Sequence, residues 1–365
     1  MNSFIVIGTC NNLIRQVLFA IRSMGDSKAL VIGGPNTRGL RWSKLCTRHA
    51  EASLAAADDT HFLALLNNFA REAPDAILVP ADCEGIRTVN RVRDALSLRA
   101  IPVPDTTTLD MFDDKWRFYQ FCRQYGLSAP ETLYIGSKAN LHYQLTVARL
   151  GTPFVIKPIN QAGSQGVQVI HSEAQYEETI RHNDSYQFFP LIAQKYVEGV
   201  DVCIDLMSMY GQVRALAFQQ RVGGEIRFFQ NRDMERLALQ LARTSVYSGV
   251  MNLDARIERG TGRVFLLESN PRFWASLTAS VGCGLNFVAE SISPAPQSQP
   301  VRMLTTGTFH LRHPIARPSS WMHMLADSGA RGRLLRARMS DMELLGDFTR
   351  SLSARLRPGR RSFQQ

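Results

Sequence analysis

A lysine at the end of an apolar segment is the first residue of this chain whose surroundings suggest chemistry. Lys157 closes the run Pro153–Lys157, Pro158 follows it, and the segment 162–166 (AGSQG) comes shortly afterwards. Glycines let a backbone approach a phosphate closely, and successive N–H groups form an anion-binding nest. A lone strand-end lysine is usually structural. Together with a glycine-rich loop and a return strand, however, it indicates binding of a nucleotide phosphate.

A second group of polar residues follows the apolar segment Val264–Leu267. Glu268 and Asn270 are two positions apart, so both side chains project from one face of an extended chain. Carboxylate and amide oxygens suit Mg²⁺, which completes its shell with phosphates and water. Asp254, on the preceding strand of the predicted hairpin, can supply a second carboxylate, and Arg272 can neutralise phosphate charge. The plain alternative is a hairpin with a polar end.

Lysine is rare in this chain, which makes each one informative. The chain has six lysines against 36 arginines. Where arginine is the ordinary basic residue, a lysine raises the question of what a compact ammonium group does that a guanidinium fork cannot. Three of the six, Lys115, Lys157 and Lys195, fall in one ordered set of motifs.

The elements that must position these residues begin with alternating strands and helices. Apolar runs at 4–8, 29–33 and 76–80 end in Gly or Pro, and the helix-compatible stretches Leu13–Met24 and Thr60–Ala73 lie between them. Such alternation implies a parallel sheet with helices on its faces. No GxGxxG motif follows the first strand, so a dinucleotide site is not supported.

Helices and hairpins are predicted in the middle of the chain. A helix is expected over Asp110–Tyr125 and a second over Glu235–Val246. The predicted hairpins pair 154–157 with 167–170, 202–209 with 212–218, and 250–257 with 263–269. Residues 292–300 read as a linker, and Trp321–Ala326 as a short helix.

Over roughly residues 110–290 the ordered motifs resemble those of the ATP-grasp superfamily. They are Lys115 in DDK, Lys157 with its glycine-rich loop, residues 194–201 (QKYVEGVD), and Asp254 followed by 268–272 (ESNPR). The last segment looks most like the carbamoyl-phosphate-synthetase and amino-acid-ligase branches.

The resemblance implies an α/β and α+β fold, with a Rossmann-like pre-ATP-grasp domain before a two-subdomain ATP-grasp module. The implied parts are an N-terminal α/β domain at 1–108, a subdomain with the glycine-rich lid at 109–193, a subdomain with the hinge and metal hairpin at 194–292, and a linker with an Arg-rich segment at 293–365.

The resemblance also implies which residues contact the phosphates of ATP. Lys115 and Lys157 would reach them from two strands. Gly163, Ser164 and Gly166 would form a flexible lid over the triphosphate.

The nucleoside would be held by a hinge. Lys195 would lie near the base, and the backbone at Tyr196 and Val197 would contact its edge. Two positions depart from the family pattern. Gln194 stands where Glu is usual, and its amide can both accept and donate, so purine preference could be relaxed. Asp201, the expected acceptor of the ribose hydroxyls, stands where the longer Glu is commoner.

The remaining roles concern metal and catalysis. Asp254, Glu268 and Asn270 would hold Mg²⁺, as two ions, with Mn²⁺ as an alternative. Arg272 would steady the transferring phosphoryl group or the acyl phosphate. Arg221 is a candidate for binding a substrate carboxylate bidentately, against the plain reading of a solvated surface arginine.

The expected function is that of a Mg-ATP-dependent ligase. It would activate a small-molecule carboxylate as an acyl phosphate for attack by an amine, such as an amino acid or peptide-like substrate, and release ADP and phosphate. Two alternatives stay open. One is a noncatalytic nucleotide-binding regulatory protein with the same fold, and the other is an enzyme that forms carbamoyl phosphate or carboxyphosphate.

Charge and composition bound the partners. Of the formal net charge of +10, residues 302–365 contribute +8 through 12 Arg, no Lys and four acidic residues, which leaves the main body nearly neutral. Nucleic acid is therefore not an expected partner. The Arg-rich end reads first as a solvated tail, with an acidic partner as an alternative, and a homodimer is admitted.

Cysteine usage and hydropathy bound the location. The six cysteines are far apart and form no CxxC pair, so a reducing cytoplasm fits best. No apolar run approaches the ~20 residues of a membrane span, and no secretory signal is expected.

Overall fold

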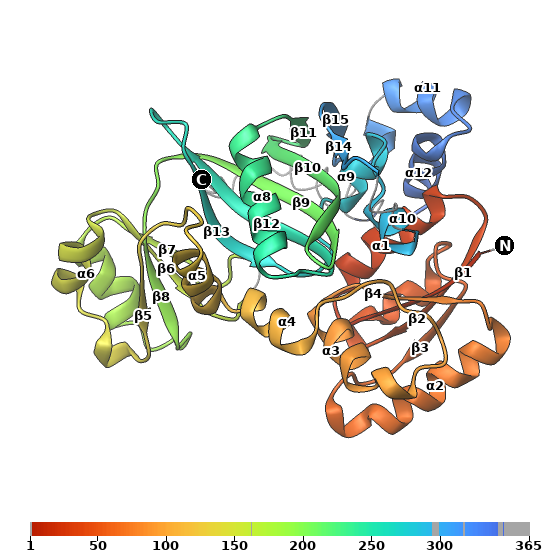
Figure 1. The fold of residues 1–365 in the computed structure, drawn as a ribbon, viewed down its shortest axis with the longest axis horizontal. Coiled ribbons are helices and arrows are strands. Elements are labelled where there is room, and N and C mark those ends of the chain that lie inside the picture. The colour runs from red at the N-terminus through yellow and green to blue at the C-terminus, as the bar shows by residue number, and fades with distance from the viewer. Residues whose placement is uncertain (1, 162, 294–298, 317, 342–345, 347–365) are drawn as a thin grey trace. The chain divides into compact units, whose positions relative to one another are not determined.

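The computed structural model describes residues 2–161, 163–293, 299–316, 318–341 and 346 (Figure 1). The chain forms two compact units. The first contains Met1–Ile101, Arg221–Phe228 and Phe273–Gln365, and the second contains Pro102–Gln220 and Phe229–Arg272. The division into four parts expected from the sequence groups the segments differently, because it separates the C-terminal segment from the N-terminal one. Among the described residues, no helix has both the length and the apolarity to cross a membrane.

A parallel sheet forms the N-terminal part of the first unit. Its strands are β1 (Asn2–Gly8), β2 (Ser27–Gly33), β3 (Arg48–Glu51) and β4 (Ile77–Pro80), in the order β3-β2-β1-β4. The central strands are continuous apolar runs, as expected for a sheet covered on both faces. The helices α1 (Asn11–Ser23) and α2 (Asp59–Glu72) follow β1 and β3, close to the predicted stretches.

The start of α1 is occupied by a carboxylate of the protein itself. Asp82, two residues after β4, accepts hydrogen bonds from the backbone N–H groups of Thr9 and Cys10, each at 2.7 Å. A Cβ atom added to Gly8 would lie 2.8 Å from Asp82 Oδ2, so glycine is needed for this approach. The carboxylate therefore sits where a dinucleotide phosphate would bind in a GxGxxG protein.

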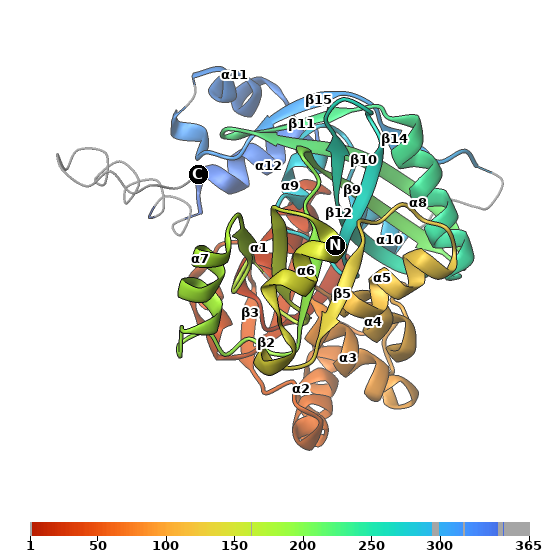
Figure 2. The same cartoon turned by 90° about the vertical axis from the view of Figure 1, so that its left-hand side faces the viewer.

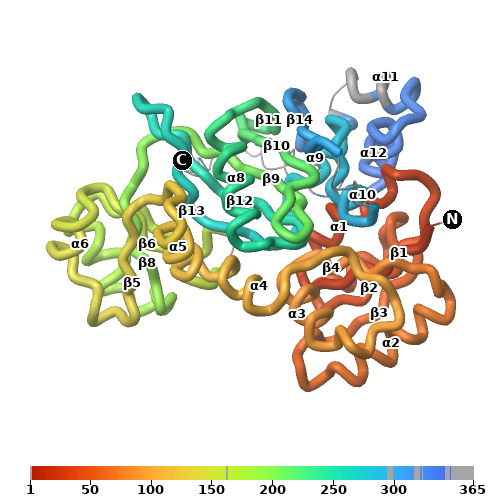
Figure 3. The backbone as a smooth tube through the Cα atoms, in the orientation of Figure 1, coloured from red at the N-terminus to blue at the C-terminus, as the bar shows by residue number. Residues whose placement is uncertain are grey.

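The C-terminal part of the first unit packs on α1. Three helices do so, namely α9 (Leu277–Gly282), α10 (Phe287–Ile292) and α12 (Ala330–Met339). In the tube of Figure 3 these blue segments run beside the red helix α1, although they are far from it in sequence. The predicted short helix at 321–326 is present as α11 (Pro318–Ala326).

The expectation of a solvated Arg-rich tail is wrong for residues 330–339, which form α12. Arg338 is buried, and its Nη1 and Nη2 donate to Thr278 Oγ1 at 3.2 Å and to the Leu311 carbonyl at 2.8 Å. Arg336 Nη1 donates to the carbonyl of Met324 at 2.6 Å. These arginines hold the helices together. The rest of the predicted tail, 342–345 and 347–365, lies outside the described residues.

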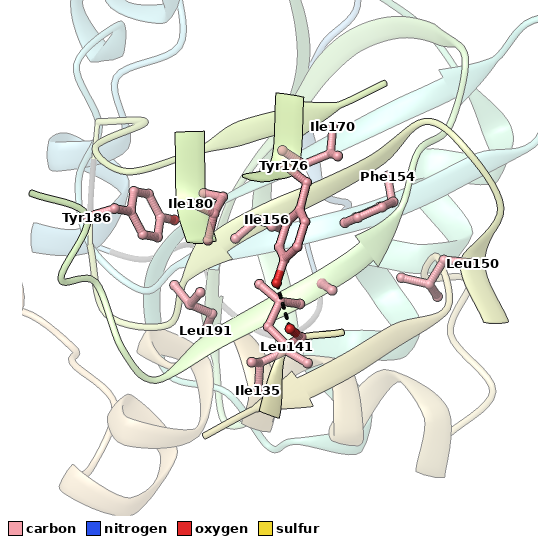
Figure 4. Close-up of a cluster of buried hydrophobic side chains, with 11 residues drawn as sticks. Ile135, Leu141, Leu150, Phe154, Ile156, Ile170, Tyr176, Ile180, Tyr186 and Leu191 are labelled. Atoms are coloured by element: carbon pink, nitrogen blue, oxygen red, sulfur yellow. Dashed lines mark hydrogen bonds between the residues drawn. The ribbon is translucent and has the colours of Figure 1, made fainter. Parts of the chain in front are cut away.

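The second unit contains an antiparallel sheet around an apolar core. Its strands are β5 (Thr132–Ile135), β6 (Phe154–Pro158), β7 (Gln168–Ile170) and β8 (Leu191–Lys195), in the order β5-β8-β6-β7. Figure 4 shows the buried cluster on this sheet, in which the hydroxyl of Tyr176 donates to the Leu141 carbonyl at 2.6 Å. That bond satisfies the polar end of a fully buried aromatic ring.

The second sheet of this unit carries the two long predicted hairpins. The strands of this sheet that belong to the second unit are β9 (Gly199–Met209), β10 (Gln212–Val222, of which the last two residues are counted with the first unit), β12 (Gly249–Glu258) and β13 (Val264–Asn270), in the order β13-β12-β9-β10. The helix α8 (Arg232–Thr244) packs against β9 (Figures 1 and 2). All three predicted hairpins are confirmed.

One predicted helix is two. The stretch expected as a single helix over Asp110–Tyr125 consists of α4 (Thr106–Asp113) and α5 (Lys115–Gln124). Asp114 separates them because it is extended, and its side chain caps α5 by accepting from the Arg117 N–H at 2.9 Å. Lys115 is consequently the first residue of a helix, and the expectation that it would reach the site from a strand is wrong.

Candidate active site

A cavity of about 360 Å³ in the second unit brings most of the predicted site residues together. Ten of them line it, namely Lys115, Lys157, Ser164, Gln194, Lys195, Tyr196, Val197, Asp201, Asp254 and Glu268. Apolar side chains such as Val155, Val169 and Leu267 complete the walls. A mostly apolar cavity of this size with converging polar groups is typical of a small-molecule site.

The glycine-rich loop reaches the cavity through Ser164, whereas Gly163 and Gly166 shape its backbone. Gly163 and Ser164 have φ values of 67° and 61°. Gly166 also has a positive φ, and a Cβ added there would lie 2.7 Å from Pro158 and 2.9 Å from Phe188. Only glycine fits this position.

Lys157 is buried beside the amide of Gln194. Its Nζ donates to Gln194 Oε1 at 2.9 Å, and Gln194 Nε2 donates to Thr132 Oγ1 at 3.1 Å. The Thr132 hydroxyl donates onward to the Pro130 carbonyl at 2.9 Å, which fixes the direction of the whole chain of bonds. Burial lowers the pKa of Lys157, and nearby Lys115 lowers it further, whereas Glu268 opposes the shift. Gln194 thus orients the lysine without neutralising it.

Lys115 joins the same cavity from the start of α5. Its Nζ donates to the Gln161 carbonyl at 2.8 Å and lies 3.6 Å from Glu268 Oε2. The break in the helix at Asp114 therefore places an ammonium group between Gln161, just before the glycine-rich loop, and the carboxylate of Glu268. Two lysines near one another repel, which favours an anion between them.

The two predicted carboxylate ligands face each other across the hairpin. Asp254 and Glu268 are register partners of β12 and β13. Burial raises the pKa of Asp254, and the neighbouring charge of Glu268 raises it further. Cys203 Sγ donates to Asp254 Oδ1 at 3.2 Å, and burial keeps this thiol protonated by raising its pKa well above the usual value. Two close buried carboxylates are a setting that a cation would stabilise.

A β-bulge aims this hairpin at the cavity. Asp254 pairs with Glu268 but Ala255 pairs with Leu266, so Leu267 is an extra residue on β13. Adjacent residues of a regular strand point to opposite faces, yet Leu267 and Glu268 both line the cavity. A bulge can place two neighbouring residues of one strand on the same side.

Asn270 and Arg272 do not line the cavity but are linked to it by hydrogen bonds. Asn270 Nδ2 lies 3.4 Å from Asp254 Oδ2 and 3.3 Å from Asn252 Oδ1. Arg272 Nη2 donates to Asn270 Oδ1 at 2.8 Å. In this arrangement the amide turns a donor toward the carboxylate pair. Its role as a metal ligand stays a prediction.

Behind this network lies a buried carboxylate that the sequence did not single out. Asp205 accepts from Gln219 Nε2 at 2.5 Å and from Asn252 Nδ2 at 2.8 Å. Burial raises the pKa of Asp205 to about 7. Asp205 could not be predicted from residue spacing, because its partners lie on the neighbouring strands β10 and β12.

The residues expected to hold a metal fit a small hard cation in part. Within the described ranges, no three His, Cys, Asp or Glu side chains cluster as a self-sufficient metal site. Asp254 and Glu268 offer two carboxylates, and Mg²⁺ is commonly held by one or two carboxylates with phosphates and water in the other positions. The donor set therefore suits a magnesium ion that arrives with a nucleotide.

The hinge residues gather around an arginine that the sequence did not predict. Arg256 lines the cavity and forms an ion pair with Asp201, to which its Nε donates, while its Nη1 donates to the Val197 carbonyl. Arginine is the ordinary basic residue of this chain, so its type alone gave no signal. Of the other predicted residues, Arg221 is exposed at the end of β10 and belongs to the first unit.

Comparison with known proteins supports the resemblance of this chain to ATP-grasp proteins. A family model described as "ATP-grasp in the biosynthetic pathway with Ter operon" matches residues 187–309. The arginine-specific carbamoyl phosphate synthase large chain of Bacillus subtilis (strain 168) is 27% identical over 216 residues, which are 54% of this chain and 20% of that protein. The D-alanine--D-alanine ligase of Petrotoga mobilis is 30% identical over 95 residues, or 26% of this chain and 29% of that one. This chain therefore spans about a fifth of the length of the synthase.

Solved structures share the fold. The L-amino acid ligase of Bacillus licheniformis has a TM-score of 0.59 at 16% identity, covering 82% of this chain and 76% of that one. The biotin carboxylase of Campylobacter jejuni has a TM-score of 0.61 at 15% identity, covering 82% and 72%. At such identities the likeness concerns the fold alone. Taken with the family model and the sequence relatives, it shows that this chain belongs to the ATP-grasp superfamily.

Proposed function

We propose that this chain is a ligase that uses Mg-ATP to activate a carboxylate as an acyl phosphate, which an amine then converts to an amide. The observation that carries the proposal is the meeting of two lysines and two carboxylates around one cavity next to the hinge. Lysines suit phosphates, and paired carboxylates suit the accompanying magnesium. The N-terminal parallel sheet would serve as the pre-ATP-grasp domain.

The first step is phosphoryl transfer. A carboxylate oxygen of the substrate attacks the γ-phosphorus of ATP, and the bond from that phosphorus to the leaving oxygen of ADP breaks. Lys115 and Lys157 would hold the phosphates, and Arg272 would steady the transferring group. Magnesium held by Asp254 and Glu268, with Asn270, would supply charge neutralisation.

The second step forms the amide. The amine nitrogen attacks the acyl carbon, the carbon–oxygen bond to phosphate breaks, and the nitrogen loses a proton to solvent. The mechanism needs no protein nucleophile. Because water also attacks acyl phosphates, the loop with Gly163, Ser164 and Gly166 would have to cover the site. Arg221 is proposed to bind the substrate carboxylate, and the cytoplasm is the proposed location.

A second candidate function is favoured by the match to carbamoyl phosphate synthases. Bicarbonate would then take the place of the organic carboxylate, and ATP would convert it to carboxyphosphate. The phosphate and metal residues would act in the same way in both reactions. Only the acceptors differ, so the acceptor is what an experiment must vary.

The proposal is tested with the purified chain and Mg-ATP. Release of ADP and phosphate is followed with pools of amino acids, and separately with bicarbonate and ammonium. Turnover that depends on an amino-acid pool and yields an amide by mass spectrometry is expected. Turnover only with bicarbonate would favour the second candidate. Tight ATP binding without acceptor-dependent turnover would favour a noncatalytic regulatory protein.

A pair of variants tests the metal assignment. Glu268→Gln is expected to abolish turnover, because it removes one of the two facing carboxylates. Glu258→Gln is the matched control, since Glu258 lies at the end of β12 and does not line the cavity. A Glu268→Gln protein that turned over normally would contradict the metal assignment.

A further inference from the structure

The cavity contains a cation to which the proposed roles assign no task. Arg256 on β12 contacts three residues of the hinge region. Its Nε donates to Oδ1 of Asp201 at 2.7 Å, its Nη2 forms an ion pair with the same oxygen at 2.6 Å, and its Nη1 donates to the Val197 carbonyl at 3.0 Å. Its guanidinium carbon lies 5.3 Å from the ring centroid of Tyr196, which is a cation–π distance.

The register of the sheet puts this arginine beside the paired carboxylates. Asp201 of β9 pairs with Arg256 of β12, and two residues further along Cys203 pairs with Asp254. Residues two apart on a strand project from one face. Both cross-strand pairs therefore line the same cavity, one at the hinge and one at the predicted metal ligands.

Asp201 needs such a partner because it is otherwise unsupported. Its side chain is 73% exposed, whereas that of Arg256 is 19% exposed. Arg256 engages only Oδ1, and Oδ2 has no hydrogen-bond partner among the residues that the structure describes. An exposed side chain loses conformational freedom when it binds a ligand, and a clamp that fixes it beforehand reduces that loss.

We propose that Arg256 is a positioning residue that holds Asp201 in place for the ribose of the nucleotide, with the Val197 carbonyl as its second anchor, and thereby sets the preference of the site for an intact ribose. The inference rests on the proposed nucleotide function. Asp201 would accept a ribose hydroxyl through its remaining oxygen. The guanidinium fork is required because it serves two acceptors at once, which a single ammonium group cannot do in the same geometry.

The test measures binding of Mg-ATP, of its 3′-deoxy analogue and of magnesium tripolyphosphate by titration calorimetry. Arg256→Ala is expected to weaken ATP binding about tenfold and the 3′-deoxy analogue by much less, so that the preference for ribose collapses. Tripolyphosphate binding should not change. Arg256→Lys should restore part of the ATP affinity. In turnover assays, the KM for ATP should rise while kcat stays close to that of the wild type.

Arg263→Ala is the matched control, and it should leave all three affinities unchanged. Arg263 lies in the turn between β12 and β13, donates to Ser128 Oγ at 3.0 Å and stacks 4.7 Å from the Phe265 centroid, but does not line the cavity. Thermal melting checks that each variant is folded, and Arg256→Gln replaces Arg256→Ala if the latter is not.

An equal loss for ATP, the deoxy analogue and tripolyphosphate, or no loss at all, would overturn the inference. It would leave the proposed function intact. Failure of the wild-type protein to bind any nucleotide would overturn both.

Discussion

Both units of this molecule bury a cation, and they use it in opposite ways. In the second unit, Lys157 spends one of its three N–H donors on Gln194 Oε1 and lines the cavity. In the first unit, Arg338 donates to Thr278 and Leu311, and its guanidinium carbon lies 5.2 Å from the Phe309 ring centroid. Burial lowers the pKa of both, that of Arg338 to about 10.

Where a buried cation directs its donors distinguishes a functional residue from a structural one more clearly than its burial or its charge does. Arg338 donates to the protein through both terminal nitrogens, although its Nε has no hydrogen-bond partner among the described residues. A buried cation that donates to several protein acceptors stabilises the fold, because removing it leaves those acceptors without partners. A buried cation that faces a cavity lowers the stability of the fold through desolvation, and its presence indicates a ligand that binds to it. Four substitutions test this contrast.

The largest effect is expected for Lys157→Met. Removing a cation from the phosphate site should lower kcat/KM for ATP by about 10³-fold, since interactions with transferring phosphates are among the strongest catalytic contributions. Thermal stability should stay equal or rise, because a desolvated ammonium group is lost. Lys138→Met is the control, as Lys138 donates to the Asn183 carbonyl away from the cavity. A melting temperature that falls together with activity would break the comparison.

Arg338→Met should do the reverse. Leaving the Thr278 hydroxyl and the Leu311 carbonyl without this donor is expected to cost about 2 kcal/mol of unfolding free energy. Chemical denaturation followed by circular dichroism measures it, with the exposed Arg331→Met as control. The folded fraction should bind Mg-ATP as the wild type does. Weaker nucleotide binding at unchanged stability would show that the two cations are not opposites.

Gln194→Glu sharpens the description of Lys157 through pH. A carboxylate in place of the amide would favour the charged lysine and raise its pKa from the lowered value that burial imposes. Phosphate binding needs the ammonium form, so the loss of ATP affinity at alkaline pH should move to higher pH. Titration calorimetry across that limb measures the shift. An unchanged limb would mean that Lys157 does not control it.

The smallest effect is expected for Asp205→Asn, a buried acid of the second unit. Burial raises its folded pKa to about 7, above the ordinary value of 3.8, so the folded state holds the proton more tightly. Its contribution to stability is complete below the unfolded pKa and is lost as pH rises toward 7. Asn cannot titrate, so the variant should lose less stability between about pH 4 and 7. Equal pH slopes of unfolding free energy would contradict this.

How much the sequence predicted depended on how local the signal was. The hairpins followed from apolar runs flanked by turn residues, and the facing of Asp254 and Glu268 followed from the third hairpin. Arg256 could not be found, because its partner Asp201 lies 55 residues away on another strand and arginine is common here. Asp205 was hidden for the same reason.

Other differences arose where a local pattern was ambiguous. The helical pattern ran through Asp114, whose capping role broke the helix and set the position of Lys115. The Arg-rich composition of 330–339 suggested solvent exposure, but Arg338 is buried between aromatic rings. Composition alone does not show which arginine of a helix turns inward.

The bulge at Leu267 has a consequence for how this hairpin can change over time. Because Leu267 is one extra residue, the alternation of inward and outward side chains in Val264–Leu266 is shifted by one position relative to that in Glu268–Asn270. Substitutions or length changes near the turn at 259–263 need not re-aim the carboxylates. Loss of the single residue Leu267 would remove the bulge and leave a regular strand, in which Ala255 still pairs with Leu266 and Asp254 still pairs with Glu268. The turn of the hairpin can therefore vary in sequence while the direction of the two carboxylates stays the same.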